Sequence, residues 1–326
     1  MGYWNGDVAV PEISVADPWR RVEMLQPDAR ATVLDHEAMG LFQALPVAET
    51  TYAVKAAGSA IISLIPPGPK KLAEQMVELR TAMDLRADRL PEILAQQGDM
   101  LSFFGAMQAL NHDRRRRTML LLSVIYGAVV SQEMRIKHFC SVTRPMDLSA
   151  QLQPIIQTPG HSAYPSGHAT EAFAFATVLA ALRLSGSPAA REHGLIPTLL
   201  GKLTPTIEAA AAADPDLLLF RLAARIADNR TVAGVHYPVD SAHGAVLGLS
   251  TALVLIAHCL GGGPENNVPT WSVNGDKWSG DFTLRKWVDE LGDADGSGWR
   301  GADSALPKVA DWHLLPRLWT LAAAEW

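Results

Sequence analysis

Three short polar blocks, in a fixed order along the chain, constrain this 326-residue sequence more than any other feature. The blocks are Lys137-x6-Arg144-Pro145, Pro165-Ser166-Gly167-His168 and Arg230-x5-His236-x3-Asp240. Arginine offers a planar fork of hydrogen-bond donors to phosphate-like oxygens, and lysine adds a compact positive charge. We therefore predict that the three blocks come together around one tetrahedral oxyanion.

The second block is expected to open a helix with Ser166 and Gly167. Backbone N–H groups and the positive end of the helix dipole then face the anion. Gly167 has no Cβ, so its N–H can approach an anion oxygen closely. His168 follows immediately and is assigned as a proton donor, with capping of its own helix as the alternative.

The third block pairs His236 with Asp240. A nearby carboxylate holds one imidazole nitrogen protonated and leaves the other free to attack. We therefore assign His236 as the nucleophile or central-atom ligand and Asp240 as the residue that orients it. His161 and Tyr164 precede the second block, and they either line the pocket or serve in loop solvation and packing.

The order and internal spacing of these blocks resemble the signature of the type 2 phosphatidic acid phosphatase superfamily. That superfamily holds acid phosphatases, lipid phosphatases and vanadium-dependent haloperoxidases. The third block departs at one position, because Asn229 stands where the family usually has serine. The resemblance implies an all-α helical bundle with its active site inside residues 137–240.

Two chemistries follow from the resemblance. In a haloperoxidase, vanadate is the cofactor and His236 is its direct ligand, while hydrogen peroxide, a halide and a small organic acceptor are the partners. In a phosphatase, His236 attacks the phosphorus of a phosphomonoester, His168 protonates the leaving oxygen, and no cofactor is needed. In both, the oxyanion is held by the same five residues: Lys137, Arg144, Ser166, Gly167 and Arg230.

The residues in and around the second and third blocks decide our choice between these chemistries. Residues 163–170 and 234–237 look more like the haloperoxidase branch, and Asn229 departs from the phosphatase serine. Against this, the chain is short for the better-known haloperoxidases. We predict a haloperoxidase, with a soluble acid phosphatase as the alternative and a non-catalytic oxyanion binder or repurposed fold as a third possibility.

Charge and hydropathy exclude other classes. The net charge is −6, which gives no general electrostatic case for nucleic acid. The basic run at residues 114–117 is predicted to be a solvated junction between helices, with an anionic-partner patch as the minority interpretation. No signal peptide and no clear membrane span of about 20 apolar residues is recognised, so we expect a soluble, cytoplasmic protein.

Apolar periodicity predicts a single domain over residues 1–326. We expect an irregular arm at 1–34, a helical core at 35–260 and a C-terminal cap at 261–326. Expected helices cover 34–45, 52–64, 70–85, 89–110, 118–139, 166–184, 214–230 and 239–260, with an irregular connection at 185–206.

No alternating strand pattern is recognised, so the predicted fold class is all-α. Seven of the nine tryptophans lie in the tail. They predict packing on the bundle, or alternatively a subunit interface in a homo-oligomer. His243 and His258, on the apolar helix 239–260, are expected to be structural.

Overall fold

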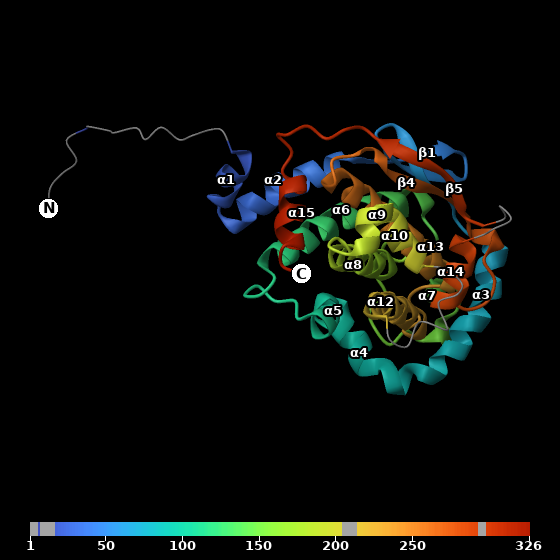
Figure 1. The fold of residues 1–326 in the computed structure, drawn as a ribbon. Helices are drawn as coiled ribbons and strands as arrows, with labels where there is room; N and C mark the ends of the chain where they lie inside the picture. The colour runs from blue at the N-terminus through green and yellow to red at the C-terminus, as the bar shows by residue number, and fades with distance from the viewer. Residues whose placement is uncertain (1–5, 7–16, 204–213, 293–297) are drawn as a thin grey trace.

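The computed structural model describes residue 6 and residues 17–203, 214–292 and 298–326. Most of this chain is helical, and one mixed sheet covers one side of the helices (Figure 1). The helices are α1 Pro18–Glu23, α2 Pro27–Gly40, α3 Pro69–Ala82, α4 Arg86–Gly98, α5 Leu101–Gln108, α6 Arg116–Cys140, α7 Pro145–Leu148, α8 Gly167–Leu184, α9 Pro188–His193, α10 Leu195–Lys202, α12 Pro215–Val232, α13 Pro238–Cys259, α14 Leu284–Leu291 and α15 Leu315–Ala323. The strands are β1 Phe42–Ala48, β2 Thr51–Ala56, β3 Ser59–Ile65, β4 Gly263–Asn274 and β5 Arg300–Leu306.

Helices α8 and α13 form the centre of the protein. Every residue of α13 is buried, which explains why its sequence is apolar all round. The two helices approach closely through Gly244 and Gly248 of α13. A Cβ at Gly248 would overlap the Thr170 carbonyl oxygen and lie 2.9 Å from its carbonyl carbon, so only glycine allows this packing.

The sequence correctly predicts the helices that carry the polar blocks. Helix α6 ends at Cys140, and Ser141 follows it with left-handed backbone dihedrals. Arg144 has extended dihedrals (φ −71°, ψ 152°), as expected for a residue before proline. Arg144 therefore leaves the axis of α6 instead of continuing it, which is what the Arg-Pro pair predicts.

The prediction of an all-α fold is wrong in one respect, because a five-stranded sheet with the order β1-β2-β3-β4-β5 is present. The expected helix at 52–64 is the β2–β3 hairpin, and the expected helix at 34–45 ends at Gly40, before β1. Ala57 and Gly58 have φ values of 51° and 83°, as a two-residue hairpin turn requires. The β-branched residues around this turn suit the buried face of a sheet.

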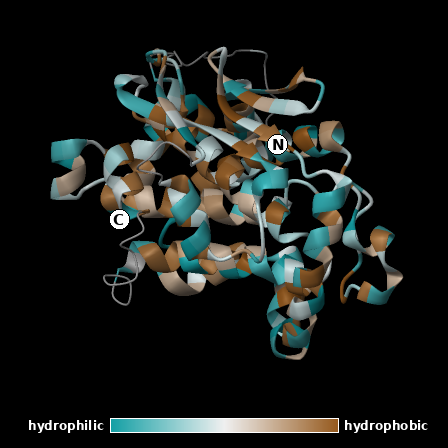
Figure 2. Cartoon of the chain, turned by 90° about the vertical axis from the view of Figure 1, so that its right-hand side faces the viewer, coloured by the Kyte–Doolittle hydropathy of each residue, from teal (hydrophilic) through white to brown (hydrophobic). Residues whose placement is uncertain are grey.

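The sheet also brings residues 42–65 together with residues 263–306. Strand β3 pairs with β4 in parallel, while β1–β2, β2–β3 and β4–β5 are antiparallel. The segment expected as a C-terminal cap thus shares a sheet with residues 42–65. Figure 2 shows the apolar helices lying beneath this sheet.

Two segments expected to be irregular contain helices. Within the expected arm, Asp17 caps α1 by accepting the Trp19 N–H at 3.0 Å, and proline begins both α1 and α2. Residues 1–5 and 7–16 of that arm lie outside the described residues. Between 185 and 203 the chain forms α9 and α10, with Ser187 capping α9, and 204–206 again lie outside the described residues.

The tail tryptophans pack largely inward. Trp287 is fully buried, packs against Phe173 in a tilted arrangement with 4.6 Å between ring centroids, and donates to the Ala242 carbonyl at 3.1 Å. Trp326 receives the guanidinium of Arg115 over its ring at 3.5 Å. The basic run at 114–117 is therefore partly a packing surface for the end of the chain.

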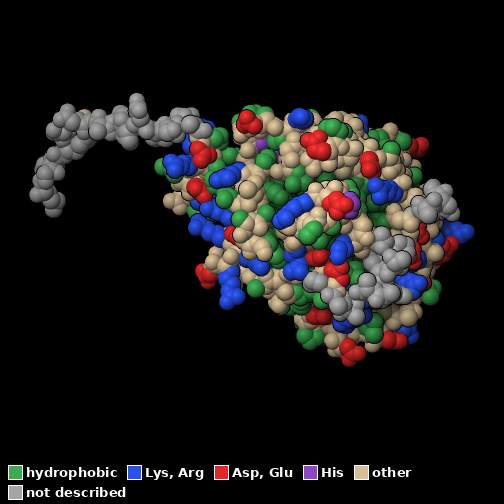
Figure 3. All heavy atoms as spheres, in the orientation of Figure 1, with side chains coloured by type: hydrophobic (Ala, Val, Ile, Leu, Met, Phe, Trp, Pro, Cys, Tyr) green, Lys and Arg blue, Asp and Glu red, His purple; other side chains and the backbone are tan. Residues whose placement is uncertain are grey.

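The surface is otherwise mixed. On the face in Figure 3, acidic and basic side chains are interspersed with apolar ones. Two segments are long and apolar enough to cross a membrane by length and composition, namely Arg116–Leu148 and Pro238–Cys259. The second is completely enclosed by protein and the first is half-buried, so their apolar character also suits core helices. The expectation of a soluble, cytoplasmic chain without a span stays a prediction.

Candidate active site

The fold brings the three polar blocks together at one end of the α8–α13 pair. Lys137 lies in the last turn of α6, Ser166 caps α8, and His236 lies in the turn between α12 and α13. The Ser166 N–H donates to the Asp240 carbonyl at 2.9 Å, and Lys137 Nζ donates to the Pro165 carbonyl. Hydrogen bonds thus connect the second block with both the first block and the third.

His236 and Asp240 form the predicted pair. His236 Nδ1 lies 3.1 Å from Asp240 Oδ2, which also accepts the Tyr237 N–H at 3.0 Å. A proton on Nδ1 is held by this carboxylate, so the lone pair of Nε2 is free. Arg144 Nη1 lies 3.2 Å from Nε2, which supports this tautomer because a guanidinium can only donate.

Electrostatics keep His236 neutral. Burial lowers the pKa of His236 well below its usual range, and the positive charges of Arg144 and Lys137 lower it further. Burial also raises the pKa of Asp240 to about 7, against the opposing effect of the Tyr237 N–H. A neutral imidazole is the form that a nucleophile or an anion ligand requires.

Arg230 offers donors that no protein group uses. Its side chain is 1% exposed, and Nη2 donates to the Ile93 carbonyl and to Gln96 Oε1, both at 3.3 Å. Nε and Nη1 are buried and have no hydrogen-bond partner within the described part of the chain. Buried donors are nearly always satisfied in folded proteins, so these two guanidinium donors are available to a bound anion.

Arg144 and Lys137 complete the positive charge. Arg144 is positioned by backbone oxygens, because Nε donates to His161 O at 2.9 Å and Nη1 to Val235 O at 2.7 Å. Lys137 is 1% exposed, and burial lowers its pKa to about 8. Both side chains therefore face the site in fixed positions.

The second block opens α8 as expected. The Ser166 hydroxyl accepts the Ala169 N–H at 3.4 Å, so it caps the helix. His168 Nε2 lies 3.1 Å from the Gln96 carbonyl, and burial lowers the pKa of His168 to about 3. His168 is thus neutral here, and its predicted role as a proton donor requires a bound dianion to raise its pKa.

Asn229, the departure from the family pattern, has a structural explanation. Its side-chain Nδ2 donates to Glu92 Oε1 and to Gln96 Oε1, both at 2.9 Å. Gln96 Oε1 also contacts Arg230. Asn229 therefore connects α12 to α4 and helps to hold Gln96, which in turn orients Arg230.

The two flanking residues differ in their placement. His161 is exposed, and its Nδ1 lies 3.1 Å from Arg144 Nη2, so it contacts the arginine that the sequence assigns to the oxyanion. Tyr164 is fully buried, and its hydroxyl lies 2.8 Å from His243 Nδ1. Tyr164 therefore packs in the core, which was the alternative to pocket lining.

Sequence reasoning missed two acidic residues beside the site. A Cβ on Gly167 would lie 2.6 Å from Glu133 Oε1, so Glu133 sits against the start of α8. Burial, followed by the negative charge of Glu171, raises the pKa of Glu133 to about 8. Burial also raises the pKa of Glu171 to about 7. The sequence feature that could have revealed Glu133 is its position one helical turn before Lys137, on a largely apolar helix.

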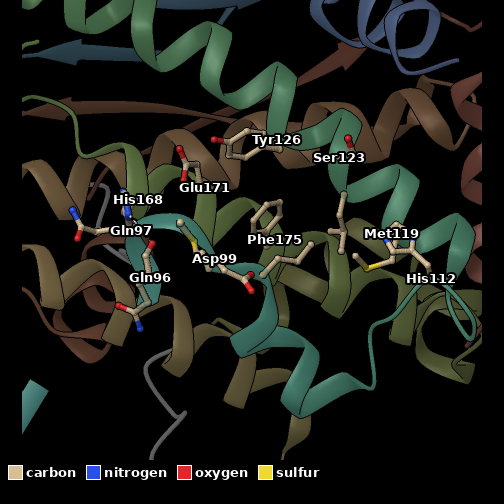
Figure 4. A pocket seen from close by; sticks show the side chains of 14 residues that line it. Gln96, Gln97, Asp99, His112, Met119, Ser123, Tyr126, His168, Glu171 and Phe175 are labelled. Carbon is tan, nitrogen blue, oxygen red and sulfur yellow. Dashed lines mark hydrogen bonds between the residues drawn. The ribbon is translucent and has the colours of Figure 1, made fainter. Parts of the chain in front are cut away.

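A cavity of about 420 Å³ reaches this site from α4, α5, α6 and α8. In Figure 4, His168 and Glu171 lie at one end of the cavity and His112 and Met119 at the other, with Phe175 between them. Its lining mixes apolar side chains with carboxyl and hydroxyl groups. The cavity can hold an organic group attached to an anion at the His168 end.

Residues 117–259 match the family model of the PAP2 superfamily, the superfamily whose signature the three blocks resemble. Over these residues the chain is similar to the PAP2 superfamily. The match includes all three blocks and the helices α6, α8, α12 and α13. The N-terminal hairpin and the segments after Cys259 lie outside it.

One similar solved structure is that of a transmembrane PAP2-type phosphatidylglycerolphosphate phosphatase from Bacillus subtilis. It is 15% identical, and the likeness covers 73% of this chain and 88% of that chain with a TM-score of 0.31. A TM-score of this size does not establish a shared overall fold. None of the curated proteins compared with the chain matches it.

Proposed function

We propose that this chain is a phosphatase of the PAP2 superfamily, which hydrolyses a phosphomonoester through a phosphohistidine at His236. The observation that carries the proposal is a neutral, Asp240-bonded imidazole in the same buried site as Arg230, which has two unused donors. The superfamily match supports this chemistry better than the haloperoxidase chemistry, which residues 163–170 and 234–237 favour.

Binding of the phosphoryl group follows from the donors present. Arg230 Nε and Nη1 receive two oxygens, and Arg144 and Lys137 neutralise the remaining charge. The Gly167 N–H and the start of α8 contribute a further donor. Charge developing on the equatorial oxygens is stabilised in a site from which water is largely excluded.

The reaction then divides into two displacements. His236 Nε2 attacks phosphorus, the bond from phosphorus to the leaving oxygen breaks, and His168 supplies a proton to that oxygen. Water next attacks the phosphohistidine and gives a proton back to His168, and phosphate leaves as His236 regains its lone pair. Asp240 holds the Nδ1 proton and stabilises the positive charge that forms on the ring.

The leaving group would occupy the cavity beside His168. Phe175 and Met119 offer apolar contact there, while Glu171 and Tyr126 offer hydrogen bonds. An alcohol with both apolar and hydroxyl or amino groups fits this lining. Inorganic phosphate alone would leave most of the cavity to water.

The haloperoxidase function remains a second prediction, because the same donors suit vanadate. His236 Nε2 would bind the vanadium, and Arg230, Arg144 and Lys137 would neutralise the vanadate oxygens. Bound vanadate would supply the centre at which hydrogen peroxide oxidises a halide. A non-catalytic oxyanion binder is the third hypothesis, and assays on the purified protein separate the three.

The decisive assay compares two activities on the same preparation. We expect phosphate release from p-nitrophenyl phosphate that vanadate inhibits and that His236→Ala abolishes. His193→Ala, which changes an exposed histidine on α9, is the control and should retain full activity. Bromide-dependent peroxide consumption by the vanadate-loaded protein, without phosphate release, would contradict the proposal. Anion binding without either activity would identify a binder.

A further inference from the structure

A second polar cluster lies at the other end of α13. It consists of Glu37 on α2, His258 in the last turn of α13 and His313 just before α15. Glu37 Oε1 is 3.2 Å from His258 Nε2 and 3.3 Å from His313 Nδ1. At about 1.5 Å of rise per residue, His258 is about 27 Å along the helix from Asp240, so the cluster is separate from the anion site.

The cluster is well shielded from solvent. The side chains of Glu37, His258 and His313 are 9%, 7% and 19% exposed, respectively. One ligand atom from each lies within 4.8 Å of the other two. Polar groups at this depth require partners, because leaving them unpaired is costly.

Hydrogen bonds satisfy only part of the cluster. Glu37 Oε1 accepts the Leu315 N–H at 3.1 Å and contacts His258, while Oε2 accepts the Leu314 N–H at 2.8 Å. His313 Nδ1 is buried without a hydrogen-bond partner among the described residues. Two ring nitrogens thus converge on one carboxylate oxygen, and hydrogen bonding alone leaves one of them unsatisfied.

We propose that Glu37, His258 and His313 bind a divalent transition-metal ion of the zinc class. Tetrahedral zinc with bonds of about 2.0–2.1 Å places its ligand atoms about 3.3 Å apart, which agrees with the separations of Glu37 Oε1 from His258 Nε2 and from His313 Nδ1. Imidazole and carboxylate donors suit zinc and its late first-row neighbours. Water would take the fourth position.

Two backbone amides hold the carboxylate of Glu37. The Leu314 N–H donates to Oε2 at 2.8 Å, and the Leu315 N–H donates to Oε1 at 3.1 Å. These two amides also fix the orientation of the carboxylate, as outer hydrogen bonds do around metal ligands. The site is therefore built before the ion arrives.

The ion would connect three elements far apart in the sequence. Helix α2 comes from the N-terminal part, α13 from the core and His313 from the segment that leads into α15. An ion that binds only the folded chain stabilises it by mass action. The proposed role is thus structural, holding both ends of the chain against the core.

The test uses the full chain, treated with a chelator and then with zinc sulfate. We expect about one equivalent of zinc to remain after desalting, and Tm to rise by at least about 2 °C. Cobalt in place of zinc should give the visible absorption bands of tetrahedral coordination. Less than about one tenth of an equivalent of zinc, with no change in Tm, would overturn the proposal.

Variants assign the ligands. His313→Ala should lose both zinc retention and the Tm response, and Glu37→Gln provides a second variant that preserves side-chain size. His193→Ala, at an exposed histidine beside Glu192, is the matched control and should keep both. Zinc retained by both cluster variants, or lost equally in the control, would show adventitious binding and contradict the assignment.

Discussion

Glu133 provides a sharp test of the anion site, because its negative charge should repel a bound anion and weaken its binding. The carboxyl group is buried against Gly167, and the charge of Lys137 acts on it. Burial, then Glu171, raises the pKa of Glu133 to about 8. A raised carboxyl pKa means that the group is neutral at pH 7 and becomes charged as the pH rises through about 8. Above that pH, a carboxylate faces the volume assigned to the oxyanion.

The size of the effect follows from Coulomb's law. Two negative charges about 5 Å apart, at an effective dielectric constant of about 20, repel by about 3 kcal/mol. At about 1.4 kcal/mol per factor of ten, this weakens anion binding by about two orders of magnitude. Glu133→Gln keeps the shape of the side chain and removes its titration, so the variant should escape this loss.

The assay is calorimetric binding of inorganic phosphate to wild type and Glu133→Gln between pH 6 and 9.5. Lys137, whose pKa burial lowers to about 8, and phosphate itself titrate in both proteins. Because the Glu133 carboxylate raises the pKa of Lys137, the difference between the two profiles reports the titration of Glu133 together with this effect on Lys137. Glu74→Gln, which changes an exposed carboxylate on α3, is the control. Parallel profiles for wild type and Glu133→Gln would refute the placement of Glu133 beside the anion.

Three further substitutions test the packing and the catalytic assignments. Gly248→Ala should lower the free energy of unfolding by about 1–3 kcal/mol or more, because a methyl group there overlaps α8, whereas Gly186→Ala, with open space around it, should not. His168→Ala should reduce kcat for phosphate release by about 10²–10⁴-fold while changing phosphate affinity little, and the reverse pattern would make His168 an anion-binding residue. Asp240→Asn should reduce phosphate release by about 10- to 100-fold, and adding it to His236→Ala should cost little more, so additive losses in that cycle would contradict their joint action.

The site was more predictable from the sequence than the fold around it. Close internal spacing in the polar blocks places His236 one helical turn before Asp240 and Arg144 just before a proline, and the structure has both arrangements. Such features depend on local backbone geometry alone. The convergence of the blocks was expected from their shared chemistry, and the hydrogen bonds among them agree with it.

The sheet was missed because short apolar segments suit both helices and strands. Residues 52–64 contain enough apolar side chains for either, and the turn at Ala57 and Gly58 was the only local indication of a hairpin. The parallel pairing of β3 with β4 joins segments separated by most of the chain. No local pattern specifies such a pairing.

The buried acidic groups were missed for a related reason. Whether Glu133 faces solvent or the anion site depends on how α6 packs on α8, which the sequence of α6 alone does not determine. His258 was expected to be structural, and its contact with Glu37 and His313 depends on three elements meeting. Clusters formed by tertiary packing have no spacing rule that reveals them.

The proposed phosphatase function requires that the three blocks form one oxyanion site. The most direct test is a crystal structure of the protein soaked with vanadate, which is nearly isosteric with phosphate. We predict one tetrahedral or trigonal-bipyramidal density feature that contacts Lys137 or Arg144, the start of α8, and both Arg230 and His236. Density found only at the surface arginines of residues 114–117, with none beside His236, would contradict it.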